Sequence, residues 1–567
     1  MSRSKPGIPG RPGRRDSALS KWITALVVFS TVFGQGDRSS SRAAESRSRK
    51  PAAKRATAAD VFYRPETVQE IQLQVHADDL ARMKKALPKR IFVPATFRWK
   101  NQVIENVGVR YKGNSSSNPR QQHKRSFLIT FSKFENEQTF LGLERVALDN
   151  GIQFGSLFSE QLITAVLRDL GITASRCNFA TLTLNGAYHG VYTNVERIDE
   201  VFIRNHFADG SGALYKNHVG GAGADLSPIG LSPDPNRRRP LAFEPKSASA
   251  HDNARDVLEL IARINRTPDK DFARVMESTI EMDAFLQTMA VMLFSGAFDQ
   301  LTGWGPHNYY LYHDPRSKRW NYLPWDLDVG FADNAFGRIP VIAGWNAAWP
   351  MMPRQPSPLV KRIIDNPQLL ARYRRLADSI LEKYFHPRVL LPKVDGLYAR
   401  VKKDLARDPF PHRRVTNPED RDFSGIITSI KNFVRLRYKT ARAQLDAPGD
   451  RPKFVRNRPR PPSPGKPSSD APTELRVVTR TATSVTLGWK DNATGEAGHV
   501  VQRANGENGQ EFRNHIGRPG GNISTAVDTG VVAGRTYRYR VYAVRPTPSG
   551  QQGTGLSKAI TVRVPDK

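Results

Sequence analysis

Two aspartates, Asp326 and Asp328, stand one residue apart at the end of the stretch RWNYLPWDLDVGF (319–331). Aspartate is disfavoured inside strands and is rarely buried without a partner. Here the two carboxylates follow an apolar, aromatic run that is typical of a buried strand. We therefore expect at least one of them to hold a metal ion.

The residues before this pair predict which carboxylate does so. The stretch NYYLYHDPRSKRWNYLP (308–324) has two strand-like runs around the turn sequence DPRSK. A hairpin centred on Ser317 pairs Asn308 with Asp326. Amide and carboxylate oxygens are suitable ligands for Mg²⁺. In this register Asp328 faces Pro306, which offers no second ligand, so Asp328 is the alternative ligand.

A third carboxylate, Asp299, ends the apolar helical run AVMLFSGAFD (290–299). An acidic residue is unfavourable near the C-terminus of a helix, which favours a functional role over a capping role. The loop 300–307 can bring it to Asn308 and Asp326. A loop Asp, an Asn, a hairpin and a further Asp follow one another as in a protein-kinase catalytic centre, although the Asp-to-Asn interval is longer and DLD replaces DFG.

The half of the chain before these residues is rich in strand patterns and should hold the nucleotide. VRYKGNSSSN (109–118) follows a strand with a glycine and small polar residues, which can cradle phosphates or form a plain surface turn. The candidate nucleotide-binding residues of this loop are Lys112, Gly113, Asn114, Ser115 and Ser116.

Three further residues are candidates for the nucleotide site. Lys124 and Arg125 open the strand SFLITF, and either could reach the phosphates; the alternative is a solvated lysine at a strand edge. Glu160, in the predicted helix 156–171, could pair with that base. Glu196, in VERID (195–199), follows a hairpin and lies where a kinase hinge would meet adenine.

The order of the patterns predicts an α+β fold with two lobes. Strand patterns and a hairpin at Asn185-Gly186 fill most of 68–196, and helical patterns cover 252–266, 281–297, 358–404 and 424–446. A Pro-rich basic linker (447–472) follows. The short alternating strands of 473–567 resemble a fibronectin type III domain, with Trp489 as its core tryptophan and Tyr537 as its tyrosine corner. Such a module usually binds proteins or glycans or acts as a spacer.

Charge and the N-terminus bear on partners and location. The chain carries 86 Lys+Arg against 54 Asp+Glu, but much of the excess lies in 1–60 and 447–466, so nucleic-acid binding is disfavoured. The single cysteine, Cys177, excludes an intrachain disulfide. A basic start and the apolar stretch Trp22–Phe33 predict a signal peptide or N-terminal anchor over 1–34 and an exported protein. We expect 35–60 to be a disordered basic linker.

The motifs together make residues 61–446 resemble the CotH-like family of atypical kinases, the spore-coat type. The resemblance is carried by VRYKGNSS, KRSFLITF, GVYTNVERID, the run from Asp299 to Asn308-Tyr-Tyr, and PWDLDVGF. It implies a divergent kinase-like fold that uses ATP with Mg²⁺ or Mn²⁺ to phosphorylate Ser/Thr of secreted or surface proteins. It assigns Lys124 to the phosphates, Asp299 to catalysis, and Asn308 and Asp326 to the metal. The alternative is a non-catalytic surface or coat protein that retains a kinase-like scaffold.

Overall fold

The computed structural model describes residues 56–566 apart from 114–115, 120–123, 152–154, 219–220, 230–240, 304–305, 333, 336–338, 343, 352–355, 411–419, 421, 453–468, 520–522 and 548–549. The predicted leader, nearly all of the predicted linker 35–60, and residues Asn114 and Ser115 of the candidate phosphate loop lie outside the described residues.

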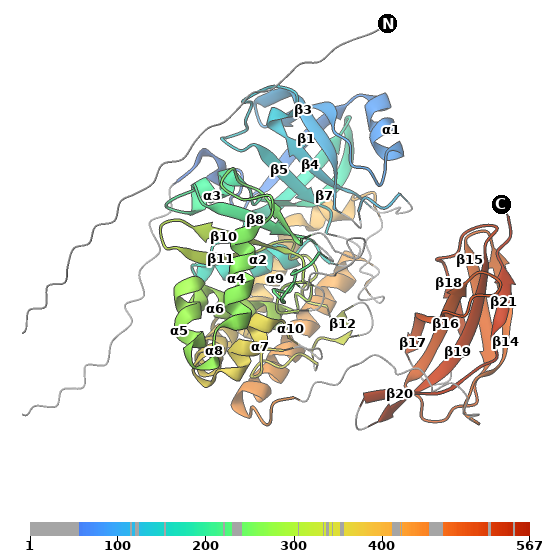
Figure 1. The fold of residues 1–567 in the computed structure, drawn as a ribbon. Coiled ribbons are helices and arrows are strands. Elements are labelled where there is room, and N and C mark those ends of the chain that lie inside the picture. Colours follow the sequence, from blue (N-terminus) through green and yellow to red (C-terminus); the bar gives the residue numbers. More distant parts are fainter. Residues whose placement is uncertain are drawn as a thin grey trace, which may run out of the picture. The chain divides into compact units, whose positions relative to one another are not determined.

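The first lobe is a closed β-barrel with the strand order β1-β2-β3-β4-β5-β7-β6 (blue to cyan in Figure 1). Every second side chain of β1 is buried, as the alternation of IQLQV predicts. Parallel pairing of β1 with β6, for example Ile71 with Leu182, closes the barrel. The strands are β1 (Val68–Val75), β2 (Val93–Trp99), β3 (Gln102–Lys112), β4 (Ser126–Thr130), β5 (Arg145–Asp149), β6 (Cys177–Leu184) and β7 (Ala187–Val195).

Two helices accompany the barrel, and a third, α3 (Glu200–His206), follows its last strand. Helix α1 (Ala77–Lys85) lies between β1 and β2, and α2 (Ser159–Asp169) precedes β6. Most of α2 is buried, including polar residues of its first turn. The hairpin turn is at Asn185-Gly186 as predicted, and both residues have positive φ.

The second lobe begins with a small sheet in the order β11-β10-β8-β9. In Figure 1 this sheet lies between the barrel and the helices of the second lobe. The hairpin β10–β11 carries the predicted catalytic stretch, and Tyr310 of β10 pairs with Lys216 of β8. The strands are β8 (Ala213–Asn217), β9 (Phe243–Pro245), β10 (Tyr309–Asp314) and β11 (Arg319–Pro324); β12 (Asn334–Ala335) and β13 (Ile339–Pro340) form a separate short pair.

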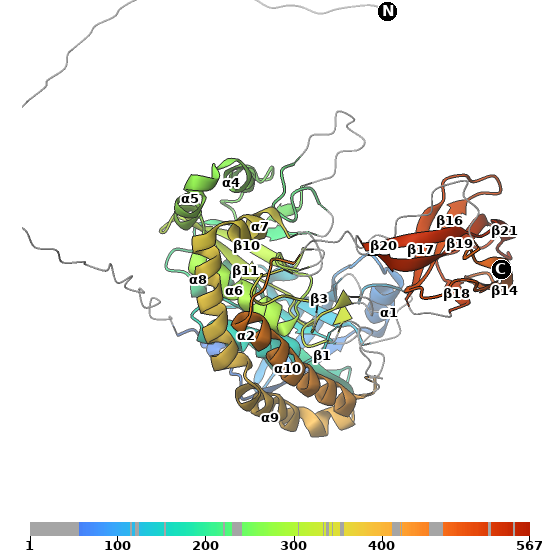
Figure 2. The ribbon, with the colours of Figure 1, turned by 90° about the horizontal axis from the view of Figure 1, so that it is seen from below.

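Helices make up the rest of this lobe. Helix α6 is apolar on nearly all sides and buried, and Gly296 ends it in a left-handed conformation, φ +73°, three residues before Asp299. Helices α9 and α10 pack side by side (Figure 2). The helices are α4 (Arg255–Arg266), α5 (Phe272–Thr279), α6 (Met282–Ser295), α7 (Pro358–Asp365), α8 (Pro367–Ile380), α9 (Pro387–Ala406) and α10 (Phe423–Asp446).

The fold differs from expectation at one boundary. The kinase-like domain was predicted to begin at residue 61, but Ala58–Asp60 already forms a 3₁₀ turn with Ala59 buried. Asp60 forms an ion pair with the buried Arg176. This pair gives a residue of the predicted linker a fixed partner in the barrel.

Residues 473–564 form a two-sheet β-sandwich, as predicted. One sheet has the order β14-β15-β18, and the other has β17-β16-β19-β20 with β21 paired to β19. Trp489 is buried in its core, and the Val532 amide donates to the Tyr537 hydroxyl at 3.1 Å. The strands are β14 (Thr473–Thr481), β15 (Ser484–Lys490), β16 (Gly498–Asn505), β17 (Arg513–Pro519), β18 (Thr525–Asp528), β19 (Thr536–Thr547), β20 (Gly550–Leu556) and β21 (Ile560–Arg563). The fibronectin type III assignment stays a prediction.

Within the part of the chain that the structure describes, no helix combines the length and apolar character needed to cross a bilayer.

Candidate active site

One half of the candidate site is a buried lysine with two carboxylates at the ends of barrel elements. Lys112 is the last residue of β3, Asp149 the last of β5, and Glu160 lies in the first turn of α2. The Lys112 ammonium forms an ion pair with Asp149, each side chain being 10% exposed. Glu160 is 2% exposed and accepts a hydrogen bond from the Leu327 amide. The barrel therefore places a paired lysine and a second, uncompensated carboxylate beside the PWDLDVGF segment.

The other half is built by the residues around Asp299. The Asn308 side-chain amide donates to Asp299 Oδ2 at 2.5 Å. The backbone amides of His307 and Asn308 also point to the Asp299 carbonyl, at 3.2 and 3.4 Å. Asp299 Oδ1 is buried and has no hydrogen-bond partner among the described residues. The loop thus folds back as predicted and joins Asp299 to Asn308.

The predicted hairpin register was wrong by one residue. The ladder pairs Tyr309 with Pro324, and the Trp325 amide donates to the Asn308 carbonyl at 3.0 Å. Asn308 therefore lies opposite Trp325, because residues 315–318 form a four-residue loop between Asp314 and Arg319. Asp326 then leaves the strand with φ +60°, a left-handed conformation that aspartate tolerates better than most residues.

The Asp326 carboxylate nevertheless acts electrostatically on residues of both halves of the site. Burial raises the pKa of Asp299 to about 8, and Asp326 is the next cause. Burial and neighbouring carboxylates, including Asp326, also hold the pKa of Glu160 well above its usual range. The pKa of Lys112 is raised because Asp149 and Asp326 together outweigh the effect of its burial. The buried carboxylates of this cluster therefore raise one another's pKa values.

Asp328 belongs to the same cluster. Burial, followed by Asp326 and Glu160, raises its pKa well above the usual range of an aspartate. Its carbonyl accepts the Ser156 amide at 2.9 Å. A Cβ on Gly155 would lie 2.3 Å from that carbonyl oxygen, so only glycine allows this close approach. Its role as alternative metal ligand stays a prediction.

A divalent cation fits this set of residues. Among the described residues, no group of three or more His, Cys, Asp and Glu side chains is arranged to hold a metal by itself. Mg²⁺, however, commonly takes one or two carboxylates together with waters and substrate phosphates. Asp326 and the Asn308 amide could supply such ligands, and the raised carboxylate pKa values mark a place where added positive charge would be stabilising.

Lys124 does not occupy the position expected of the phosphate-binding lysine. Its ammonium donates to Asp408 at 2.7 Å and to the Val191 carbonyl at 2.5 Å. Both charged side chains of this pair are 1% exposed. Lys124 is therefore neutralised by a carboxylate that follows α9, and Lys112 is the lysine of the carboxylate cluster.

Glu196 is also engaged elsewhere. Arg176 donates to both of its carboxylate oxygens, and the His206 ring lies 3.0 Å from Oε2. These partners hold the pKa of Glu196 at about 2 despite its burial. With its oxygens occupied in this way, Glu196 ties barrel segments together, and the expected contact with a nucleotide is not supported.

The candidate phosphate loop is described in part. Gly113 has φ +83°, and the Ser116 hydroxyl donates to the Lys112 carbonyl. Arg125 donates to the carbonyls of Ser116 and Asn118. Arg125 thus shapes this turn, and the phosphate-cradling role of the turn stays a prediction.

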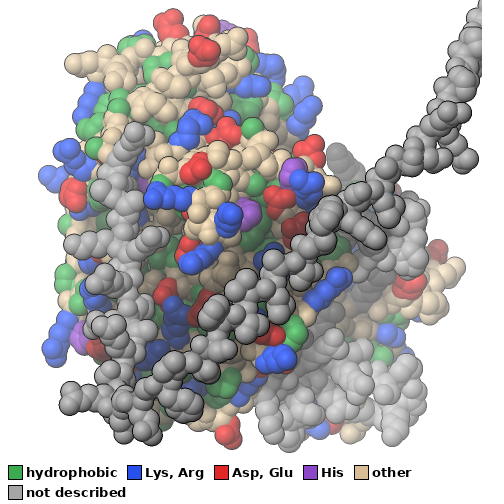
Figure 3. All heavy atoms as spheres, turned by 60° about the vertical axis from the view of Figure 1, so that its left-hand side comes forward, with side chains coloured by type: hydrophobic (Ala, Val, Ile, Leu, Met, Phe, Trp, Pro, Cys, Tyr) green, Lys and Arg blue, Asp and Glu red, His purple; other side chains and the backbone are tan. Residues whose placement is uncertain are grey.

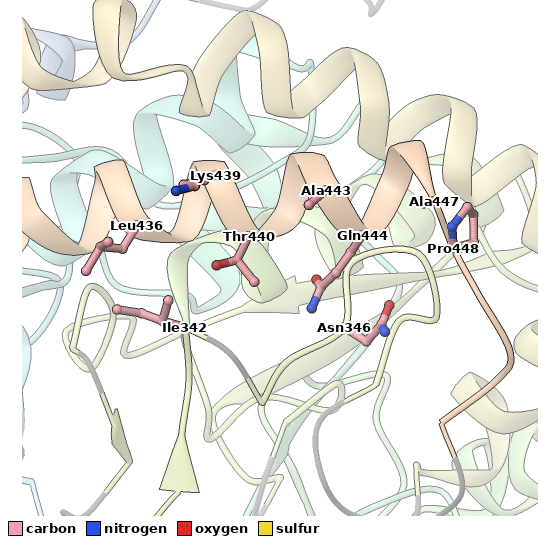
Figure 4. Close-up of a pocket in the computed structure, with 9 residues that line it drawn as sticks. All are labelled: Ile342, Asn346, Leu436, Lys439, Thr440, Ala443, Gln444, Ala447 and Pro448. Atoms are coloured by element: carbon pink, nitrogen blue, oxygen red, sulfur yellow. The ribbon is translucent and has the colours of Figure 1, made fainter.

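A cavity of about 570 Å³ lies along α10 and is separate from these residues (Figure 4). Its wall includes Lys439, Thr440 and Gln444 of α10. Gln444 accepts the Ala347 amide at 2.8 Å and so has a structural role. Among the described residues of this wall there is no carboxylate or histidine, and we assign the cavity no part in the chemistry.

Sequence reasoning missed three residues of the site. Asp149 ends the apolar strand RVALD, and this pattern, an aspartate after an apolar run, is the same signal that identified Asp326. Arg197 and Lys216 have no comparable local signal, because the sheet contacts that bring them near Asp326 join distant segments of the chain.

Comparison with known proteins identifies the family of the chain. The family model described as CotH kinase protein matches residues 109–441. The chain therefore belongs to the CotH kinase protein family. Among curated proteins, it is similar to the inner spore coat protein H of Bacillus subtilis (strain 168), with 26% identity over 367 residues, 64% of this chain and 94% of that protein.

Two solved structures that the chain resembles each align with a small part of it. A structure titled "Myokine structure" aligns with 17% of this chain and 99% of its own, at 17% identity and a TM-score of 0.15. The twitchin kinase region from C. elegans aligns with 18% of this chain and 17% of its own, at 18% identity and the same TM-score. Scores this low carry no argument.

Proposed function

We propose that the protein is an exported CotH-type kinase that transfers the γ-phosphoryl group of ATP to Ser/Thr hydroxyls of a secreted or surface protein. The observation that carries the proposal is the convergence of Lys112, Asp149 and Glu160 from the barrel with Asp299, Asn308 and Asp326 from the second lobe. Membership of the CotH kinase protein family supports it.

Five residues of this cluster have a proposed role in that reaction. Asn308 and Asp326 would hold Mg²⁺ or Mn²⁺, which when bound neutralises charge on the phosphates. Asp299 is fixed through Oδ2 by Asn308, which leaves Oδ1 to accept the proton of the acceptor hydroxyl. Lys112, held by Asp149, directs positive charge towards the phosphates.

The alternative is a coat or adhesion protein without turnover. It is favoured by the name of the curated relative, an inner spore coat protein, and by the β-sandwich of residues 473–564, in which we identify no catalytic constellation. The two proposed functions differ in their need for Asp299: the kinase requires its proton-accepting oxygen, and the coat or adhesion protein does not.

The face of the molecule drawn in Figure 3 does not favour nucleic acid as the partner. On the face drawn in Figure 3, Lys and Arg side chains are interspersed with Asp and Glu. A nucleic-acid interface would present a more uniform basic field.

Incubation of the full chain with γ-labelled ATP, Mg²⁺ or Mn²⁺, and dephosphorylated casein as a generic Ser/Thr acceptor tests the proposal. We expect metal-dependent labelling that is lost in both Asp299→Ala and Asp326→Ala. Asp395→Ala is the matched control, because Asp395 pairs with Lys431 on the exposed side of α9. ATP binding without any labelling in the wild type would favour the coat-protein alternative, and absence of ATP binding would refute the kinase.

A further inference from the structure

Two cations near Asp326 have no counter-ion of their own. Lys216 of β8 and Arg197, which follows β7, are both half-buried, and among the described residues neither side chain forms an ion pair or a hydrogen bond. The other cations of this region contrast with them, since Lys112 pairs with Asp149 and Lys246 pairs with Glu244.

Both cations lie against the aromatic residues of the catalytic hairpin. The Arg197 guanidinium is 5.2 Å from the centroid of the Trp325 ring, and the Lys112 ammonium is the same distance from that ring. The Lys216 ammonium is 5.8 Å from the Tyr310 ring, whose edge meets Trp325 at 6.2 Å between centroids. The positive groups thus share one aromatic surface beside Asp326.

The positive charges of Lys216 and Arg197 repel each other. Burial and then Arg197 lower the pKa of Lys216 to about 7, and Asp326 offsets this only in part. Two half-buried cations held this close are destabilised unless an anion lies between or beside them. The protein provides no carboxylate that contacts either cation within hydrogen-bond distance in the described residues.

An unused hydrogen-bond donor lies in the same place. Tyr310 is 0% exposed, yet its hydroxyl has no partner among the described residues. The Lys216 ammonium lies 5.8 Å from the centroid of the ring that carries this hydroxyl. A buried donor without a partner is destabilising, so this hydroxyl is a second, independent indication of a missing acceptor.

We propose that Lys216 and Arg197, together with the Tyr310 hydroxyl, bind the phosphate chain of the nucleotide beside Asp326. This assignment rests on the proposed kinase function and adds a second set of phosphate-binding residues to Lys112. A triphosphate carries the negative charge that two unpaired cations require, and Arg is suited to bidentate contacts with phosphate oxygens. Neutral or cationic ligands would leave the repulsion between Lys216 and Arg197 unrelieved.

The test is a series of calorimetric titrations of the full chain with ATP, ADP, AMP and adenosine at fixed Mg²⁺. Lys216→Met and Arg197→Met keep side-chain length and aromatic contact while removing the charge. We expect each to weaken ATP binding roughly 10- to 100-fold and to leave adenosine binding unchanged. Lys216→Arg should restore most of the affinity for ATP.

Lys402→Met is the matched control, because the Lys402 ammonium lies 6.0 Å from the Tyr398 ring on α9 in a similar aromatic contact. It should leave all four affinities unchanged. Thermal unfolding of each variant checks that the fold is retained.

The outcomes separate this assignment from the proposed function. If the wild type binds no ATP, the kinase proposal fails. If the wild type binds ATP and both Met variants bind it equally well, or lose adenosine in parallel with ATP, the kinase proposal stands and this assignment is overturned. A phosphoserine peptide is titrated in the same way. If the variants keep their affinity for ATP and lose only that for this peptide, the cations serve the phosphorylated acceptor and the nucleotide assignment is likewise overturned.

Discussion

The ion pair between Arg176 and Glu196 gives a stability prediction whose size follows from the structure. Glu196 is 1% exposed and its pKa lies at about 2, against 4.5 for an ordinary glutamate. A pKa difference of this size corresponds to about 3 kcal/mol of stability at neutral pH. Glu196→Gln keeps the volume and removes the charge, and it leaves Arg176 with the more exposed Asp60 as its remaining carboxylate partner.

The sign of the pH dependence follows from the lowered pKa. The contribution of Glu196 is fully present above about pH 4.5 and is lost as the pH falls towards 2, because protonation of the folded state then removes the charge that His206 and Arg176 stabilise. The difference in unfolding free energy between wild type and Glu196→Gln should therefore be about 3 kcal/mol at pH 7 and should approach zero near pH 2.

Urea unfolding at several pH values, followed by far-UV circular dichroism, measures this difference. Glu144→Gln is the control, since Glu144 lies 3.5 Å from Arg145 in a half-exposed pair and should change stability by less than about 1 kcal/mol. A difference that does not vary with pH would refute the reasoning. So would a Glu196→Gln variant of unchanged stability that has lost ATP binding, because Glu196 would then act on the nucleotide, as its position after the hairpin predicts.

Further predictions concern catalysis and the buried lysine. Asp299→Asn should lower kcat by about 10²- to 10⁴-fold with less than threefold change in ATP affinity, as measured by initial rates and calorimetry; an equal loss of both would make Asp299 a binding residue. Lys124→Met should destabilise the fold by about 3–5 kcal/mol because it leaves Asp408 buried without its cation, as measured by urea unfolding. Unchanged stability with lost ATP binding in Lys124→Met would restore the phosphate role first expected for this lysine.

The local patterns of the sequence were sufficient for most elements and for the meeting of Asp299 with Asn308. Apolar spacing predicts the strands and helices, and the hairpin turn at Asn185-Gly186 is encoded by two adjacent residues. Asp299 and Asn308 are separated by nine positions in the sequence, so the conformation of a single loop determines their contact. These features depend on short-range geometry, which sequence patterns report.

The features that were missed depend on longer-range or finer geometry. Closure of the barrel joins β1 to β6, segments more than a hundred residues apart. The choice between Lys112 and Lys124 depends on Asp408, which lies 284 residues after Lys124 and has no sequence signal that links it to the barrel. The hairpin register was wrong because the number of loop residues sets it, and a loop one residue shorter than predicted shifts every pair.

The most direct test of the central claim, that the Asp326 cluster is a metal–ATP site, is calorimetric titration of the full chain with ATP in the presence and absence of Mg²⁺. The wild type and Asp395→Ala should bind ATP far more tightly with Mg²⁺ than without it. Asp326→Ala should lose that metal-dependent gain. Metal-independent binding by the wild type, or an undiminished Mg²⁺ effect in Asp326→Ala, would contradict the account.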